Sequence, residues 1–149
     1  MATISQFKKP HSDSLVLLPI FSSAISAGFP SPADDHVEDR LDLNRYLISQ
    51  PASTFFMRFE GDPMLESGLQ QGDLLIVDRS VDPTDSKIVV AAINGELVVR
   101  RVRQSRRQLR LLSENPNCPT ICITKDTEFQ IWGVVTYVIR TLHSTRRLQ

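Results

Sequence analysis

A chain of 149 residues can bury one substantial hydrophobic core but is too short for two full domains. Apolar residues make up 41% of it and charged residues 23%, which is typical of a globular protein and excludes a disordered or fibrous one. Basic and acidic residues number 17 each, so the net charge neither favours nor excludes a nucleic-acid partner. Lysine is scarce and occurs only as Lys8, Lys9, Lys87 and Lys125.

Residues 1–32 are expected to form an extended N-terminal arm, and residues 33–149 the folded domain. The arm holds one apolar patch, Leu15–Phe21, followed by small residues and the sequence GFPSP. Pro30 and Pro32 restrict their own φ and push the preceding residues toward extended conformations. The apolar patch predicts that the arm docks on another surface.

The arm also has some likeness to a secretory signal, because Lys8-Lys9 precede the apolar patch and small residues follow it. Asp13 just before the patch and Pro19 inside it argue against secretion, so the cytoplasm is the expected location. No apolar run approaches the ~20 residues of a membrane span, and no membrane contact is expected.

Beyond the arm the pattern predicts one short helix and then strands. Asp42 stands at an N-cap position before apolar residues at helical spacing, which predicts a helix from Asp42 to Ile48. Asn94-Gly95 predicts a tight hairpin, because both residues tolerate positive φ. Gly and Asp residues between short strands indicate a mainly β fold. Strands are predicted at residues 54–59, 74–78, 88–93, 96–103, 108–112, 120–124 and 129–140.

The cysteines and histidines predict neither a metal site nor a cofactor. Cys118 and Cys122 lie four residues apart, and His11, His36 and His143 are scattered along the chain. We therefore expect both cysteines to be buried thiols in a strand region.

The segment Phe59–Asp78, FEGDPMLESGLQQGDLLIVD, has the build of a reactive turn between two strands. A Gly-Asp pair breaks the chain, and Pro63 stands at the apex before Met64. Together with IVVAAINGELVVRRV and the upstream AGFPSPADDHVEDRLDLN, this turn resembles the UmuD branch of the LexA-like S24 self-cleaving peptidases. The resemblance extends over about residues 16–138. It implies a small LexA/UmuD-like β-rich peptidase fold preceded by a cleavable arm.

Such peptidases use a Ser-Lys dyad, in which a lysine of lowered pKa takes the proton of a nucleophilic serine. The resemblance maps the serine to Pro63 and the lysine to Arg100. Proline has neither a hydroxyl nor a backbone N–H, and arginine stays protonated at any physiological pH. The resemblance therefore implies a peptidase whose two dyad positions are non-functional. Arg100 could instead pair with Asp62 or Asp73 and hold the old cleft together.

Substitutes for the dyad are poorly placed in the sequence. If the match to the family's motif were shifted by one residue, the base position would fall on Arg101, which is also an arginine. The nearest lysine, Lys87, stands at the start of the preceding strand, where the motif does not place the base. Ser53 and Ser67 do not follow a Gly-Asp pair, and loop serines usually serve as turn or cap residues.

The bond that the family cleaves corresponds to Ala27-Gly28, within the sequence AGFPSP. Small residues on both sides would let an extended segment enter a narrow cleft, although a flexible linker has the same composition. We expect a cleavage site or its remnant, which makes this chain a substrate that lacks its own catalytic dyad.

Three functions remain open. The first is a catalytically impaired, UmuD-like accessory protein of the SOS response and translesion DNA synthesis. The resemblance implies that it forms a homodimer, or a heterodimer with an active UmuD-like paralogue. It also implies that the dimer binds a Y-family DNA polymerase and the RecA–ssDNA filament. The second is a residual or trans-acting serine peptidase. The third is a nucleic-acid-binding β module that uses Arg100, Arg101, Arg103, Arg106, Arg107 and Arg110. No aromatic residue interleaves with these arginines, and we favour the first function.

Overall fold

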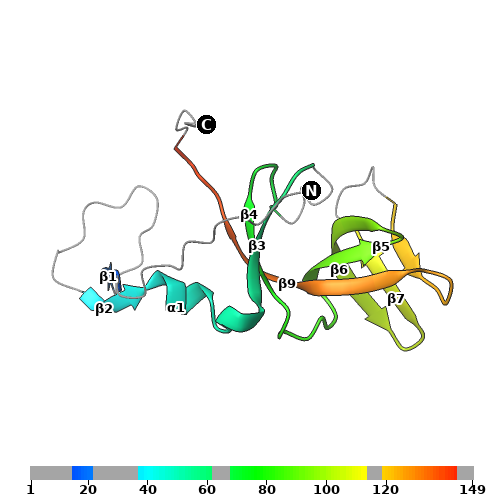
Figure 1. Ribbon diagram of the computed structural model, residues 1–149, viewed down its shortest axis with the longest axis horizontal. Coiled ribbons are helices and arrows are strands. Elements are labelled where there is room, and N and C mark those ends of the chain that lie inside the picture. Colours follow the sequence, from blue (N-terminus) through cyan, green and yellow to red (C-terminus); the bar gives the residue numbers. More distant parts are fainter. Residues whose placement is uncertain (1–14, 22–36, 62–67, 114–118, 144–149) are drawn as a thin grey trace. The chain divides into compact units, whose positions relative to one another are not determined.

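The computed structural model describes residues 15–21, 37–61, 68–113 and 119–143 (Figure 1). The chain divides into two compact units, Met1–Tyr46 and Leu47–Gln149. The predicted boundary between residues 32 and 33 lies outside the described residues. No helix in the described part of the chain is long and apolar enough to cross a membrane.

In the first unit, β1 (Leu17–Phe21) pairs antiparallel with β2 (Val37–Asp42) in a two-stranded sheet. The sequence pattern predicts neither strand. Every residue of β1 is exposed, because a two-stranded ribbon has no second layer to cover its apolar side chains.

The predicted short helix is confirmed as α1 (Leu43–Leu47). Asp42 caps it: one carboxylate oxygen accepts a hydrogen bond from the backbone N–H of Asn44 at 3.1 Å. A 3-10 turn, Pro51–Ser53, then leads into the main sheet.

The second unit is built on a seven-stranded antiparallel sheet with the order β3-β4-β9-β5-β6-β7-β8. All seven predicted strands are present, with ends that match or differ by at most two residues, and the mainly β fold is confirmed. The strands are β3 (Thr54–Arg58), β4 (Leu74–Asp78), β5 (Ile88–Ile93), β6 (Glu96–Ser105), β7 (Gln108–Leu112), β8 (Ile121–Ile123) and β9 (Phe129–Ile139).

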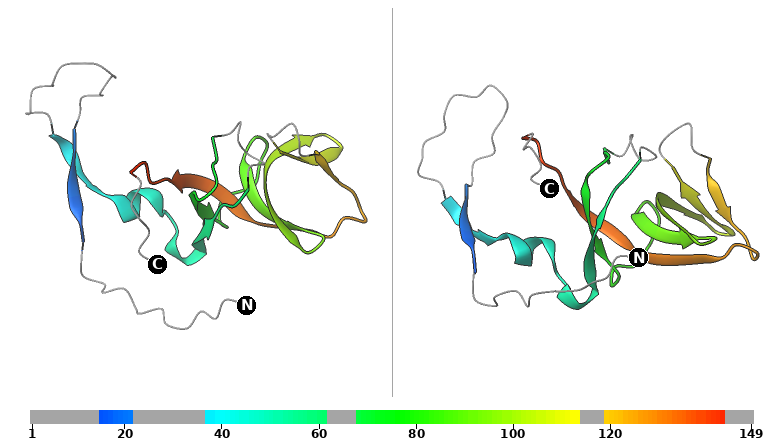
Figure 2. Two further views of the ribbon diagram at one scale, coloured as in Figure 1. Left: turned by 90° about the horizontal axis from the view of Figure 1, so that it is seen from above. Right: turned by 45° about the horizontal axis from the view of Figure 1, so that its top comes forward.

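The long strand β9 joins the two halves of this sheet. Its first half pairs with β5 and its second half with β4 (Figure 1), while β5 to β8 curl round into a half-open barrel (Figure 2). Gly133 lies where the two pairings meet. A Cβ there would stand 2.7 Å from Cγ1 of Val77 and 3.1 Å from the carbonyl oxygen of Asp78, so this position has room only for glycine.

The hairpin predicted at Asn94-Gly95 is confirmed and joins β5 to β6. Asn94 has φ of 49° and Gly95 of 83°, the left-handed backbone that a two-residue hairpin turn needs.

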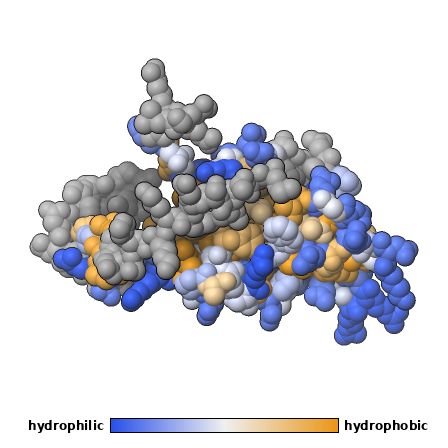
Figure 3. Space-filling model, in the orientation of Figure 1, coloured by the Kyte–Doolittle hydropathy of each residue, from blue (hydrophilic) through white to orange (hydrophobic). Residues whose placement is uncertain are grey.

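Side chains of β5 point alternately to the two faces of the sheet, and they pack into two separate hydrophobic clusters. Val90 packs with Phe59, Leu75 and Val77, whereas Val89 packs with a second group that contains Val102, Leu111 and Val134. On the face seen in Figure 3, hydrophilic side chains gather at the end of the second unit that holds β6 and β7.

Candidate functional site

The turn that carries Pro63 leaves and rejoins the sheet at one hydrogen-bonded point. Phe59 donates its N–H to the carbonyl of Asp73 at 2.8 Å, and its carbonyl accepts from the N–H of Gly72 at 2.7 Å. The Phe59 side chain is only 3% exposed, and Arg58 Nη1 also donates to the Gly72 carbonyl at 2.9 Å. Both ends of the turn are therefore anchored on the sheet.

Asp73 ties this anchor to the end of β9. Its carboxylate, 1% exposed, accepts from Arg140 Nε at 2.7 Å and from Arg140 Nη2 at 2.6 Å. The N–H of Gln70 donates to the same carboxylate at 2.8 Å, and Arg140 Nη2 also donates to the carbonyl of Gly68. The hydrogen bonds from Arg140 hold the pKa of Asp73 below its ordinary value, against burial, which raises it. Asp73 is thus a charged structural group rather than a proton donor.

A cavity of about 430 Å³ opens beside this anchor, between the end of β3 and β6. Arg100, at the predicted lysine position, and Glu60, which leads into the turn, both line it. The structure therefore brings the predicted base position to the foot of the predicted reactive turn. The remaining lining residues are Met57, Arg58, Phe59, Val90, Glu96, Leu97, Val98 and Val99.

The guanidinium of Arg100 is poorly satisfied in this cavity. Its Nη1 donates to the carbonyl of Val99 at 2.8 Å, while its buried Nε has no hydrogen-bond partner among the described residues. A buried unpaired donor costs about 1–3 kcal/mol. The alternative in which Arg100 pairs with Asp73 is wrong, because Arg140 occupies that carboxylate; Asp62 lies outside the described residues.

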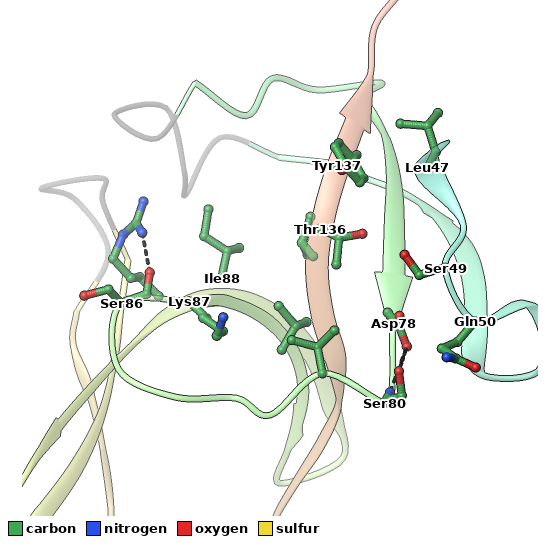
Figure 4. Close-up of a pocket in the computed structure, with 14 residues that line it drawn as sticks. Leu47, Ser49, Gln50, Asp78, Ser80, Ser86, Lys87, Ile88, Thr136 and Tyr137 are labelled. Atoms are coloured by element: carbon green, nitrogen blue, oxygen red, sulfur yellow. Dashed lines mark hydrogen bonds between the residues drawn. The ribbon is translucent and has the colours of Figure 1, made fainter. Parts of the chain in front are cut away.

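Lys87 lines a different cavity, of about 600 Å³, together with Asp78 and Ser86 (Figure 4). Ser53, an alternative nucleophile in the 3-10 turn before β3, donates to Asp78 Oδ1 at 2.9 Å. Ser86 accepts from Arg103 Nη1 at 2.7 Å. In the described part of the chain these hydroxyls are hydrogen-bonded to an aspartate and an arginine and not to Lys87, and the alternative of a relocated nucleophile stays a prediction.

Among the predicted site residues, Arg100 is the one that the structure describes. Pro63, Ala27 and Gly28 lie outside the described residues, as does the alternative nucleophile Ser67, and their roles stay predictions. Sequence reasoning missed Arg140, whose partner Asp73 is 67 residues away in the chain and shares no local pattern with it.

The prediction of two buried thiols is wrong for Cys122, which is free and exposed. It lies on β8, the edge strand of the sheet, directly opposite Arg110 on β7. Cys118 lies outside the described residues. Within the described ranges, no three His, Cys, Asp or Glu side chains gather in a way that could hold a metal ion.

The curved sheet, the anchored turn and the cavity lined by Arg100 are consistent with the small β-rich peptidase fold that the sequence predicts. Residues 19–136 match the family model "Peptidase S24-like", and the chain belongs to this family.

Individual relatives agree with this assignment. The chain is 44% identical to "Protein ImpA" of Salmonella typhimurium over 141 residues, which is 94% of this chain and 93% of the relative. It is 46% identical to "Protein SamA" of Salmonella typhimurium (strain LT2) over 127 residues, 85% and 88% of the two chains. It is also 35% identical to "LexA repressor 1" of Xanthomonas campestris pv. campestris over 128 residues, 86% of this chain and 63% of that repressor. The predicted resemblance to the UmuD branch of the LexA-like family is confirmed.

Proposed function

We propose that this chain is a UmuD-like accessory protein of SOS mutagenesis that has lost its own peptidase activity. It dimerises, binds an error-prone DNA polymerase of the Y family and works in the cytoplasm. The observation that carries the loss of activity is Arg100 in the cavity beside the turn. A guanidinium keeps its proton at physiological pH and cannot take one from a nucleophile.

In this proposal the former catalytic surface binds instead of cleaving. The turn is still anchored through Phe59, Asp73 and Arg140, although the residues of the dyad have changed. The adjacent cavity is large enough for a few side chains of an extended segment. An anchored turn beside an open cavity supports a role in docking an arm, either of this chain or of a partner subunit.

The exposed strand β1 supports dimerisation. Leu18 is 62% exposed and Phe21 57%, and the two-stranded sheet of the first unit offers them no cover. Large exposed apolar patches mark protein interaction sites. A second copy of this chain, or an active UmuD-like paralogue, is the partner that we propose for this strand.

The test is incubation of the purified chain with RecA on single-stranded DNA and ATP, with mass spectrometry to detect loss of residues 1–27. We expect the chain to stay intact alone and to be cut at Ala27-Gly28 only when an active UmuD-like paralogue is added. Gly28→Val is the matched control, because its side chain would hinder entry of the segment into a narrow cleft. Spontaneous cleavage of the isolated chain would sink the proposal.

The dimer is tested separately by sedimentation of the same sample at several concentrations. A chain that stays monomeric at all of them, alone and with the paralogue, would contradict the proposed dimer.

A further inference from the structure

The even charge balance of the whole chain conceals a strongly basic hairpin. From Glu96 to Leu112, β6 and β7 hold one acidic residue, Glu96, and six arginines, which leaves a formal charge of +5 on this ribbon. The arginines are Arg100, Arg101, Arg103, Arg106, Arg107 and Arg110.

The register of the ribbon places part of this charge on its outer face. Val102 and Leu111 lie opposite each other and are fully buried in the core. Because side chains alternate along a strand, the neighbouring cross-strand pair, Arg103 and Arg110, lies on the opposite face. Two like charges directly opposite each other destabilise a sheet. An anion bound between them would relieve this repulsion.

Among the residues that the structure describes, much of this charge has no carboxylate partner. Arg103 is partly compensated, since its Nη1 lies 4.0 Å from Asp85 Oδ2. Arg106, Arg107 and Arg110 are exposed, and in the described part of the chain they contact no carboxylate. Arg106 and Arg107 form the turn at the tip of the hairpin, and Figure 3 shows hydrophilic side chains projecting at that end of the molecule.

We infer that the tip and outer face of the β6–β7 hairpin bind the phosphate backbone of DNA through Arg106, Arg107 and Arg110. The guanidinium fork matches two phosphate oxygens at once, and all the basic residues of the ribbon are arginine.

The composition of the hairpin favours DNA over an acidic protein. Protein interfaces usually depend on aromatic or other apolar anchors, and β6 and β7 contain no aromatic residue. The same strands offer no aromatic side chain on which bases could stack, so binding should depend on phosphate contacts and fall as the salt concentration rises. This inference rests on the hairpin alone and does not depend on the proposed function.

The test is fluorescence anisotropy of labelled single-stranded and duplex oligonucleotides of mixed sequence, titrated with the full chain. Three phosphate contacts predict that affinity falls roughly 20-fold for single strands, and roughly 40-fold for duplex, between 50 and 200 mM salt. Changing Arg106, Arg107 and Arg110 together to alanine should abolish most of this dependence, whereas the three lysine replacements should keep it. Arg45→Gln with Arg79→Gln removes exposed charge elsewhere and should leave binding nearly unchanged.

Thermal unfolding by circular dichroism checks that the variants are folded. The inference fails if the wild-type chain does not bind at 50 mM salt, or if the triple alanine variant binds with the same affinity and salt dependence. It also fails if polyglutamate displaces DNA at equal charge concentration, because the hairpin is then a surface for acidic proteins. Neither readout involves cleavage or a partner subunit, so these results are independent of the test of the proposed function.

Discussion

Arg140 holds Asp73 through two parallel hydrogen bonds, Nε to Oδ1 at 2.7 Å and Nη2 to Oδ2 at 2.6 Å. The pair joins the end of the turn that carries Pro63 to the residue that follows β9. Because the Asp73 side chain is 1% exposed, its charge depends on Arg140 for compensation. The end of the turn at the candidate site is therefore stabilised by a contact between residues that lie far apart in the sequence.

Replacement of this carboxylate should destabilise the fold. In Asp73→Asn the amide cannot accept both hydrogen bonds from Arg140, and we expect a loss of about 2 kcal/mol in the free energy of unfolding. Urea denaturation followed by fluorescence measures it. Asp82→Asn, an exposed aspartate on the same unit, is the control and should change stability by less than about 0.5 kcal/mol. Equal effects of the two variants would show that the Asp73–Arg140 pair contributes little.

Acid should weaken the fold through two buried aspartates, Asp73 and Asp78. Arg140 lowers the pKa of Asp73, and the hydroxyl of Ser80 is the main cause of the lowered pKa of Asp78. A carboxyl whose folded-state pKa is depressed contributes stability that is fully present above its unfolded pKa, near 3.8. That contribution is lost as the pH falls through the lowered folded value.

We therefore expect the free energy of unfolding to decline steadily as the pH drops below about 4, measured by urea denaturation at a series of pH values. Asp73→Asn should show a shallower decline than the wild type, because one of these two buried carboxyl groups no longer titrates. An unchanged decline in this variant would mean that Asp73 does not carry the acid sensitivity.

Gly133→Ala tests the junction of β9 with β4. The added methyl group would lie 2.7 Å from Cγ1 of Val77. It could not shift away easily, because backbone atoms of Asp78 also lie close to it. We expect a loss of roughly 1–3 kcal/mol in unfolding free energy. Gln130→Ala, at an exposed position of the same strand, is the matched control and should be close to neutral. A stable Gly133→Ala variant would show that the strands can separate without cost.

Restoration of the dyad tests the assignment of the active site. The double variant Pro63→Ser with Arg100→Lys should regain cleavage at Ala27-Gly28, at least ~100-fold faster than either single variant, because nucleophile and base act as a unit. Mass spectrometry of the chain incubated with RecA on single-stranded DNA measures it. Activity of Pro63→Ser alone would show that Arg100 does not occupy the base position. Adding Ser53→Ala to the double variant should change nothing, since Ser53 is bound to Asp78.

The sequence by itself determined the seven strands of the main sheet, the Asn94-Gly95 hairpin and the short helix after Asp42. These depend on alternation, turn residues and capping, which act over a few neighbouring residues. The resemblance also predicts which chemistry is missing, because a proline and an arginine at the two dyad positions could not serve as nucleophile and base.

Only the tertiary structure decided how distant residues meet. It paired Asp73 with Arg140 rather than with Arg100, paired β1 with β2, and placed Cys122 on an exposed edge. It also divided the arginine run, leaving the Nε of Arg100 buried in a cavity and Arg110 on the outer face. Strand register and pairing set these outcomes, and both arise from packing between segments that no local pattern connects.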